Sequence, residues 1–205
     1  MGPRVLEVGA GLGASTRQFA DYDCQTWVAL EPDPELVAVL HQHQADQVLP
    51  AHCVIREGTL AALDETDTFD TILYIDVLEH IEADRQEVAA AARHLKPGGY
   101  LVVLSPAFQF LYTPFDEAIG HYRRYTKKTI GQLSPENCQV VRGYYLDAVG
   151  MLPSVGNLLF LKSPQPSLNQ IRFWDRFLVP VSRVVDRLVG YRFGRSIVYV
   201  WQRTG

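Results

Sequence analysis

The 205-residue sequence is poor in sulfur and has no long uninterrupted apolar run. Its three cysteines, Cys24, Cys53 and Cys138, are odd in number and lack C-x-x-C spacing. This argues against a disulfide framework or a zinc cluster and favours reduced thiols in the cytoplasm. No run approaches the ~18 apolar residues that span a bilayer. The amino terminus has no apolar segment of the signal-peptide kind.

The first half of the chain has few basic residues, and the second half has few acidic ones. Residues 1–120 carry 6 Lys or Arg and 19 Asp or Glu, a net charge of −13. Residues 121–205 carry 13 and 4, a net charge of +9. This asymmetry indicates either an anionic partner or a surface dipole with some charges paired across the fold. The acidic first half and the lack of a recognition motif or lysine-rich stripe argue against a nucleic-acid partner.

Short apolar runs alternate with helical stretches in the first half. Strands are expected at residues 4–8, 26–30, 52–55, 69–75 and 100–104. Helices are expected at residues 13–20, 34–44 and 84–95. We expect Asp33 and Asp84 to be N-caps, and Lys96-Pro97-Gly98-Gly99 to end the third helix. Strands alternating with helices in this way predict a parallel sheet with helices on both faces.

The pattern changes after residue 105. An aromatic-rich, loop-like segment is expected first. A short helix at 126–133 and a strand at 138–145 should follow it. The last expected elements are an irregular connection at 151–167, a helical stretch at 168–189 broken or kinked at Pro180, and a strand at 196–202. We expect residues 1–205 to form one domain, with a core at 4–105 and a substrate-side region at 106–205.

A glycine-rich turn follows the first strand and opens a helix. Its sequence from residue 9 is Gly-Ala-Gly-Leu-Gly, and glycine lets the backbone turn sharply and approach a ligand closely. Glu31 ends the second strand, about 20 residues after the turn, where an acid can bind ribose hydroxyls. Gly9, Gly11 and Ala14 also fit the dinucleotide-binding pattern. This region therefore predicts a nucleoside-containing cofactor without identifying it, and a turn without a ligand is the simplest alternative.

Four motifs together extend this prediction. They are Glu-Val-Gly-Ala-Gly-Leu-Gly at 7–13, Leu-Glu-Pro-Asp at 30–33, Asp-Val-Leu-Glu-His at 76–80 and Leu-Lys-Pro-Gly-Gly at 95–99. In this order and spacing, over residues 4 to about 105, the set closely resembles the class I S-adenosylmethionine-dependent methyltransferases. The resemblance implies an α/β, Rossmann-like three-layer sandwich. Its mainly parallel seven-stranded sheet has an antiparallel last strand beside the fifth. A nicotinamide oxidoreductase is not expected to carry the last two motifs.

The resemblance also implies the residues that bind S-adenosylmethionine. They are Glu7, Gly9, Ala10, Gly11, Glu31, Pro32, Gly58, Thr59, Leu60, Asp76 and Val77. Glu7 would hold the methionine ammonium, Glu31 the ribose, and Pro32 would flank the adenine. The family often has an acid at the position of Thr59, so the contact to the adenine amino group departs from the pattern. The family also has one or two helices before the first strand. Only three residues precede it here, so we expect a truncated start, or a lid from residues 106–125.

The run His-Tyr-Arg-Arg-Tyr at 121–125 follows the fifth strand, on the substrate side of the fold. It is similar to a run in a subgroup of bacterial methyltransferases. His121 can act as a general base, and the arginines can bind a carboxylate or phosphate. The predicted substrate-binding residues are Tyr122, Arg123, Arg124 and Tyr125. Alternatively, the two arginines pair with Asp116 and Glu117 and fix the loop. His80 is a second catalytic candidate, and its alternative role is to order the start of a helix.

These observations predict an S-adenosylmethionine-dependent methyltransferase, with O-methylation of a small, anionic or lipid-linked metabolite as the leading hypothesis. Nitrogen or carbon acceptors and a non-catalytic cofactor-binding module are the alternatives. No metal-binding constellation is evident, which disfavours a cation-dependent mechanism. The stretch 168–189 mixes apolar residues with arginines. Its apolar face is expected to cover the sheet or the cleft, and the alternative is a helix at a membrane surface. The sequence leaves the oligomeric state open.

Overall fold

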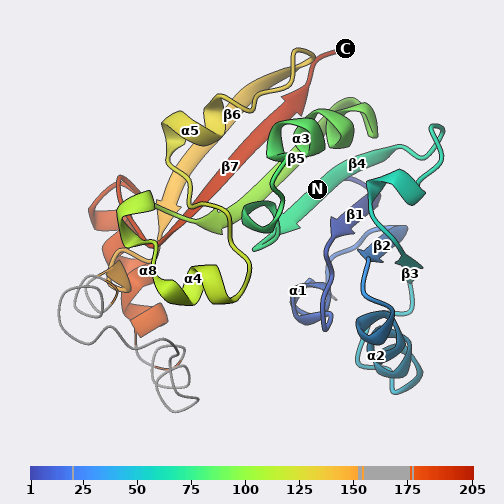
Figure 1. Ribbon diagram of the computed structural model, residues 1–205. Helices are drawn as coiled ribbons and strands as arrows, with labels where there is room; N and C mark the ends of the chain where they lie inside the picture. The colour runs from blue at the N-terminus through green and yellow to red at the C-terminus, as the bar shows by residue number, and fades with distance from the viewer. Residues whose placement is uncertain (20, 152–153, 155–175, 177) are drawn as a thin grey trace.

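The computed structural model describes residues 1–19, 21–151, 154, 176 and 178–205. A seven-stranded sheet runs through the molecule in the order β3-β2-β1-β4-β5-β7-β6 (Figure 1). The strands are β1 (Arg4–Val8), β2 (Thr26–Glu31), β3 (Cys53–Glu57), β4 (Phe69–Ile75), β5 (Leu95–Pro106), β6 (Cys138–Leu146) and β7 (Ser196–Arg203). The pairings among β1 to β5 are parallel, and β7 lies antiparallel between β5 and β6. This confirms the predicted Rossmann-like sheet.

Helices connect the strands, and all but the one at Pro114–Ala118 lie where the sequence pattern predicted a helix. They are α1 (Ala14–Gln18), α2 (Pro34–Ala45), α3 (Asp84–Arg93), α4 (Pro114–Ala118), α5 (Lys127–Gly131) and α8 (Val179–Leu188). Single turns of 3₁₀ helix occur at η1 (Leu60–Ala62), η2 (Leu78–His80) and η3 (Gln109–Leu111). Asp33 caps α2 as predicted, because its side chain accepts the backbone N–H of Glu35 at 2.8 Å. The prediction for Asp84 was wrong: Ala83 is the N-cap of α3 and Asp84 is its first residue.

Two further predictions need correction. Lys96–Gly99 does not separate a helix from a strand, because α3 ends at Arg93 and β5 already starts at Leu95. The tetrapeptide is an irregular excursion within β5, whose pairing with β4 resumes at Tyr100 opposite Thr71. The aromatic-rich segment 106–125 is not purely a loop, because it contains η3 and α4. Pro at the first helical positions starts both α2 and α4, where its missing N–H costs nothing.

The predicted helical stretch at 168–189 is described only in part. Helix α8 begins at Val179 with Pro180 in its first turn, which agrees with a break in the stretch at this proline. Residues 168–175 and 177 of the predicted stretch lie outside the described residues, as does most of the predicted connection at 151–167. Among the residues that are described, no helix is long and apolar enough to cross a membrane.

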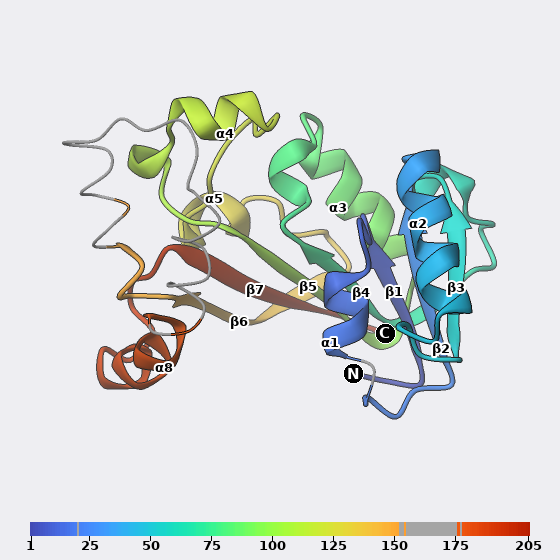
Figure 2. The ribbon, with the colours of Figure 1, turned by 90° about the horizontal axis from the view of Figure 1, so that it is seen from below.

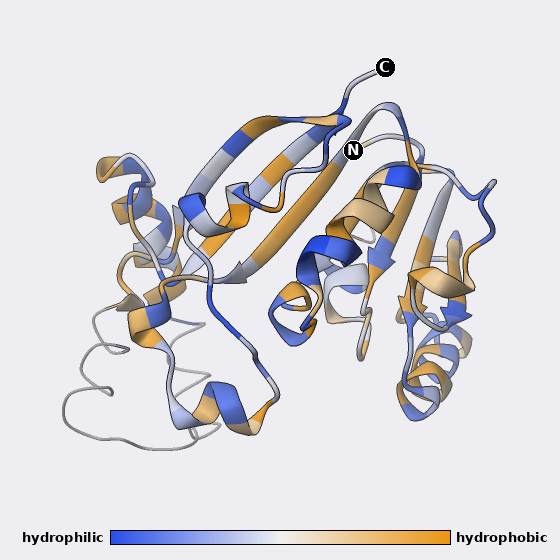
Figure 3. Ribbon diagram, turned by 45° about the horizontal axis from the view of Figure 1, so that its top comes forward, coloured by the Kyte–Doolittle hydropathy of each residue, from blue (hydrophilic) through white to orange (hydrophobic). Residues whose placement is uncertain are grey.

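The sheet buries one apolar cluster on each face, since side chains alternate along a strand. Leu6 and Val8 of β1 belong to the larger cluster, which includes residues of α3 and α5. Val5 of β1 belongs to the smaller cluster, with Leu40 of α2. Figure 2 shows the helices above and below the sheet, and hydrophobic colour follows the central strands in Figure 3. The carboxyl ends of β1, β2, β4 and β5 therefore share one edge of a rigid sheet.

Candidate active site

The glycine turn after β1 is packed on one side and open on the other. Gly9, Gly11 and Gly13 have φ angles of 70°, 56° and 75°, in the left-handed region that favours glycine. The Gly9 N–H donates to the Leu30 carbonyl at 2.8 Å, which ties the turn to the end of β2. A Cβ on Gly9 would lie 2.6 Å from the Val77 side chain, whereas a Cβ on Gly11 would meet nothing within 4 Å. The open side at Gly11 permits close approach of a ligand.

Glu31 is held against this turn. Its side chain is buried, and its carboxylate accepts the Gly11 N–H at 2.8 Å and the Asp33 N–H at 3.0 Å. Both oxygens are thus fixed by backbone donors from two loops, one after β1 and one after β2. Pro32 follows as an exposed residue. The sequence predicted that the glycine turn lies next to an acid from the neighbouring strand, and the structure has this arrangement. The contacts of both with a ligand stay a prediction.

Glu7 lies buried beneath the turn. Its Oε2 accepts the Thr16 hydroxyl and the Trp27 indole N–H, the latter at 2.9 Å. Burial raises the pKa of the Glu7 carboxyl above its usual range, and the two hydrogen bonds oppose that shift. This acid joins β1 to α1 and β2. A nearby cation would favour its charged form, which is compatible with the predicted contact to an ammonium group.

The predicted adenine-side residues follow β3. The Gly58 N–H donates to the Glu31 backbone carbonyl at 2.9 Å, so this loop is tied to the end of β2. Leu60 is buried and Thr59 is exposed. Both line a groove of about 740 Å³ that extends toward α3. This groove does not include the glycine turn or Glu31. The tie between Gly58 and Glu31 is what places the loop near the turn, and its contact with adenine stays a prediction.

Asp76 and Val77 stand at the end of β4. Asp76 has a φ angle of 54°, unusual for a residue with a side chain, and its N–H donates to the Leu104 carbonyl of β5. Part of the Asp76 side chain is exposed to solvent. Desolvation by the surrounding protein raises the pKa of the Asp76 carboxyl, and the charges of His121 and Arg195 oppose this shift. Asp76 thus lies at the carboxyl end of β4, next to Val77, whose side chain adjoins Gly9 of the glycine turn. Backbone strain such as the positive φ angle of Asp76 is concentrated at functional sites.

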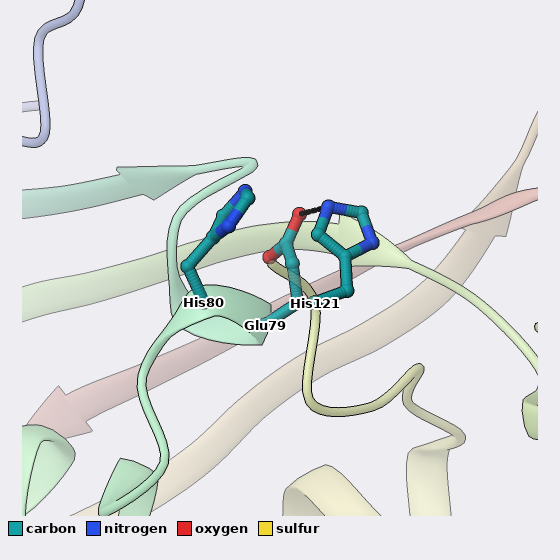
Figure 4. A group of neighbouring side chains, drawn as sticks. All are labelled: Glu79, His80 and His121. Carbon is teal, nitrogen blue, oxygen red and sulfur yellow. Dashed lines mark ion pairs between the residues drawn. The ribbon is translucent and has the colours of Figure 1, made fainter. Parts of the chain in front are cut away.

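Glu79 and the two candidate histidines meet beside Asp76 (Figure 4). Glu79 is completely buried, and one carboxylate oxygen accepts the Ser105 hydroxyl at 2.9 Å. The other oxygen, Oε1, has no hydrogen-bond partner among the described residues and lies 3.9 Å from His121 Nε2. The His80 ring stands edge-on to the His121 ring, with centroids 4.5 Å apart. Burial raises the pKa of Glu79 to about 7.

Asp116 holds the opposite side of the His121 ring. His121 Nδ1 lies 3.0 Å from Asp116 Oδ1, and the Asp116 carboxylate is almost fully buried. An imidazole fixed by a carboxylate at Nδ1 presents Nε2 as its reactive nitrogen. The sequence prediction did not assign a role to Glu79, and it considered Asp116 only as a partner of the two arginines. Glu79 lies in the motif at 76–80 and Asp116 lies five residues before His121, but only the fold brings them to opposite sides of one ring.

Three of these residues can also be judged as metal ligands. Ligand atoms of Glu79, His80 and His121 lie within 4.8 Å of one another. In the described part of the chain this is the only such group. It shows that residues distant in sequence form a potential ligand set that spacing alone did not reveal. The sequence-based expectation of no metal stays a prediction.

The segment 121–125 is anchored to the rest of the molecule. Arg124 binds Asp116 through two nitrogens, at 2.8 and 2.9 Å. Arg123 pairs with Asp84 at 2.7 Å, and the Tyr125 hydroxyl donates to the same carboxylate at 2.8 Å. The loop-fixing alternative is thus realised for Arg124 with Asp116, whereas Arg123 pairs with Asp84 and not with Glu117. Substrate binding by these residues stays a prediction.

Tyr122 differs from its neighbours in this segment. About half of its surface, 52%, is exposed, while its N–H donates to the Glu79 carbonyl at 2.8 Å. The hydrogen bond fixes the backbone of Tyr122 next to the buried acid and leaves the ring accessible. Of the four predicted substrate-binding side chains, Tyr122 is the most available for a ligand.

Residues 6–103 match the family model described as a methyltransferase domain. This chain carries a methyltransferase domain. The match covers the strands and loops that build the glycine turn, Glu31 and the 76–80 segment, and it confirms the class predicted from the four motifs. The methyl donor of the class I methyltransferases is S-adenosylmethionine.

Relatives of the methyltransferase domain agree with this assignment. The chain is 33% identical over 100 residues to a ubiquinone biosynthesis O-methyltransferase of Xanthomonas oryzae pv. oryzae. That match spans 49% of this chain and 41% of the relative. A proposed sarcosine dimethylglycine methyltransferase from Galdieria sulphuraria has a similar fold, with a TM-score of 0.67 at 16% identity over 100% of this chain and 79% of that one.

A third similar protein is the N-methyltransferase NodS from Bradyrhizobium japonicum, in complex with S-adenosyl-L-homocysteine. Its TM-score is 0.61 at 15% identity, covering 98% of this chain and 78% of NodS. At this identity the two structural likenesses establish a shared fold.

Proposed function

We propose that this protein transfers a methyl group from S-adenosylmethionine to an oxygen atom of a small acceptor molecule, in the cytoplasm. The observation that carries the proposal is the Glu31 carboxylate, held at the Gly11 N–H on the open side of the glycine turn. An acid in this position can accept hydrogen bonds from both ribose hydroxyls. The methyltransferase family match supports the identity of the nucleoside.

The residues around the turn suit this donor. Gly11 leaves room for close approach, and Asp76 and Val77 stand at the neighbouring strand end, where the methyl group would lie. Glu7, buried below the turn, would favour the ammonium of the methionine part. When bound, the donor supplies an electrophilic methyl group on a sulfonium, whose departure leaves a neutral thioether. The protein's main task is then to hold the acceptor close and aligned in a dry site.

His121 is the proposed general base. As the acceptor oxygen forms its bond to the methyl carbon and the sulfur–carbon bond breaks, the hydroxyl proton passes to His121 Nε2. Asp116 at Nδ1 orients the ring and stabilises the imidazolium that results. Glu79, 3.9 Å from Nε2, adds negative charge on the side where the proton arrives. The O-methyltransferase name of the Xanthomonas oryzae relative also supports an oxygen acceptor.

Replacing Glu31 tests the donor site. We expect Glu31→Ala to abolish measurable S-adenosylmethionine binding in titration calorimetry, because the ribose loses its acceptor and the glycine turn loses its anchor. Glu35→Ala is the matched control, since it removes the same charge from an exposed position in the first turn of α2. Unchanged affinity in Glu31→Ala would refute the assigned donor site.

Replacing His121 tests the chemistry separately. We expect His121→Ala to lower kcat by about 10²- to 10⁴-fold, the usual contribution of a general base, with little change in donor affinity. Asp116→Asn should produce a smaller loss of the same kind, because an amide still contacts the ring but no longer stabilises the imidazolium, and the pair with Arg124 is weakened as well. An acceptor screen with labelled methyl donor provides the assay. Weaker donor binding at unchanged kcat would mean that His121 is structural, and an unchanged rate would favour an amine acceptor bound in its neutral form.

A further inference from the structure

Helix α8 turns its apolar residues outward. Val181, Val184 and Leu188 are 50%, 60% and 81% exposed, whereas Ser182 and Asp186 on the opposite side are 3% exposed. Residues spaced by three and four lie on one face of a helix, so the three apolar side chains form a single stripe. This reverses the usual burial of a surface helix. For residues 179–188, it also contradicts the expectation that the apolar face of the stretch 168–189 covers the sheet or the cleft, and the rest of that stretch lies outside the described residues.

The reversed orientation is fixed by hydrogen bonds. Asp186 accepts the N–H groups of Asp147 and Ala148, at 2.9 and 2.8 Å. The Ser182 hydroxyl donates to the Asp147 carboxylate at 2.6 Å. These bonds attach the polar face of α8 to the chain that leaves β6. The apolar stripe therefore points away from the described part of the protein, because the polar face of α8 is already engaged.

A row of positive charge accompanies the stripe. Arg183 and Arg187 are exposed and one helical turn apart. Neither forms an ion pair within the described ranges. On a helix they lie between the buried polar face and the apolar stripe, on the outward side. Exposed apolar side chains flanked by arginines are typical of helices that lie in a membrane interface with anionic lipids.

Helix α8 also lies near the carboxyl end of β5. It precedes β7, whose first residue, Ser196, pairs with Pro106 at the carboxyl end of β5. The carboxyl ends of β1 and β4, with the glycine turn and Asp76, belong to the same edge of the sheet. Figures 1 and 2 show α8 projecting at the outer end of β6 and β7. Helix α8 thus lies near the same end of the sheet as the proposed donor site.

We propose that α8 docks this protein on an anionic membrane surface, with Val181, Val184 and Leu188 in the acyl boundary and Arg183 and Arg187 on lipid phosphates. Three side chains cover only a small part of the roughly 800 Å² per partner that a stable protein interface needs. Charge complementarity favours lipid over a second copy, whose α8 would present arginines to arginines. A corollary rests on the proposed function: if the protein is a methyltransferase as proposed, its acceptor is an amphiphile in the membrane.

Vesicle co-sedimentation of the full chain tests the electrostatic part. We expect binding to phosphatidylcholine vesicles containing phosphatidylglycerol, and little binding to phosphatidylcholine alone. Arg183→Gln/Arg187→Gln should weaken anionic binding roughly 30-fold, from about a kilocalorie per mole for each arginine near such a surface. Arg85→Gln/Arg93→Gln is the matched control, since both arginines are exposed on α3. Equal sedimentation with both vesicle types would overturn the proposal.

The apolar part has its own tests. Leu188→Trp should show a blue-shifted fluorescence emission on anionic vesicles, relative to the unsubstituted chain, and Val184→Ser/Leu188→Ser should lose most of the binding. Binding that survives this pair of serines would contradict docking by α8. A dimer in sedimentation equilibrium that the same serines dissolve would assign the stripe to self-association instead. Donor binding by the arginine and serine variants, measured by calorimetry, should be unchanged. Because vesicle binding needs no donor, failure of the proposed methyl transfer and failure of the docking proposal are separate results.

Discussion

At the scale of single residues, the site contains three buried glutamates, although carboxylates are rarely buried in proteins. Glu7, Glu31 and Glu79 are each at most 5% exposed. Glu31 has backbone donors on both oxygens, and Glu7 has two side-chain donors on one oxygen. Glu79 has one donor only and keeps a buried oxygen without a partner among the described residues. Its desolvation is therefore the least compensated of the three, which is a cost typical of functional sites.

This cost predicts how stability changes with pH. The pKa of Glu79 is about 7 in the folded protein and about 4.5 as a free side chain. Below pH 4.5 the group is protonated in both states and contributes no difference. As pH rises to 7 and above, the folded state alone resists ionisation and loses about 3 kcal/mol. We expect Glu79→Gln to raise Tm by several degrees at pH 8 and to change it little at pH 4.5, measured by calorimetry.

The matched control for this measurement is Glu117→Gln, which removes an exposed acid from α4. It should leave Tm nearly unchanged at both pH values. A Glu79→Gln effect that does not depend on pH would contradict the raised pKa.

At the scale of elements, the segment between β5 and α5 is a loop closed at its base and braced inside. Tyr125 pairs with Ala107 at the base, and Arg123 reaches Asp84 on α3. Inside the loop, Arg124 makes two hydrogen bonds to buried Asp116, which also contacts His121. Ion pairs therefore help to position the segment that carries the proposed base, in addition to its buried residues Leu111 and Tyr125.

Removing the inner brace should loosen this element. Arg124→Gln leaves the Asp116 carboxylate buried without its cation, a change that typically costs 3–5 kcal/mol. We expect a lower urea midpoint and faster proteolytic cleavage within 109–124. Arg123→Gln is the comparison, because Arg123 is more exposed, at 32% against 13% for Arg124, and its pair with Asp84 is worth less. Equal effects of the two substitutions would contradict the assignment of Arg124 as the main brace.

At the scale of the whole molecule, the opposed charges of the two halves serve two purposes. Some are paired between the halves, as Arg123 with Asp84 and Arg124 with Asp116 illustrate. Arg183 and Arg187 are not paired among the described residues and stay at the surface of α8. The sequence allowed two interpretations of the basic half, charges paired across the fold or an anionic partner. Each interpretation therefore applies to different arginines of that half.

The sequence by itself determined the strand–helix order, the glycine turn with its partner acid, and the methyltransferase class. These depend on local features: apolar runs, glycines that adopt positive φ, and acids at the ends of strands. It did not reveal that Lys96–Gly99 lies inside β5, because pairing with β4 is a contact between distant segments. It also did not assign a role to Glu79 or place Asp116 beside His121, because both contacts depend on burial around one imidazole.

Only the tertiary structure decided which face of α8 is exposed. The pattern of Val181, Val184 and Leu188 with two arginines is equally compatible with a buried and an exposed apolar stripe. The choice depends on where Asp147 lies, because Asp186 and Ser182 bind the backbone and side chain there. A helical pattern defines two faces, and the partners that the fold brings to one of them determine which face meets solvent.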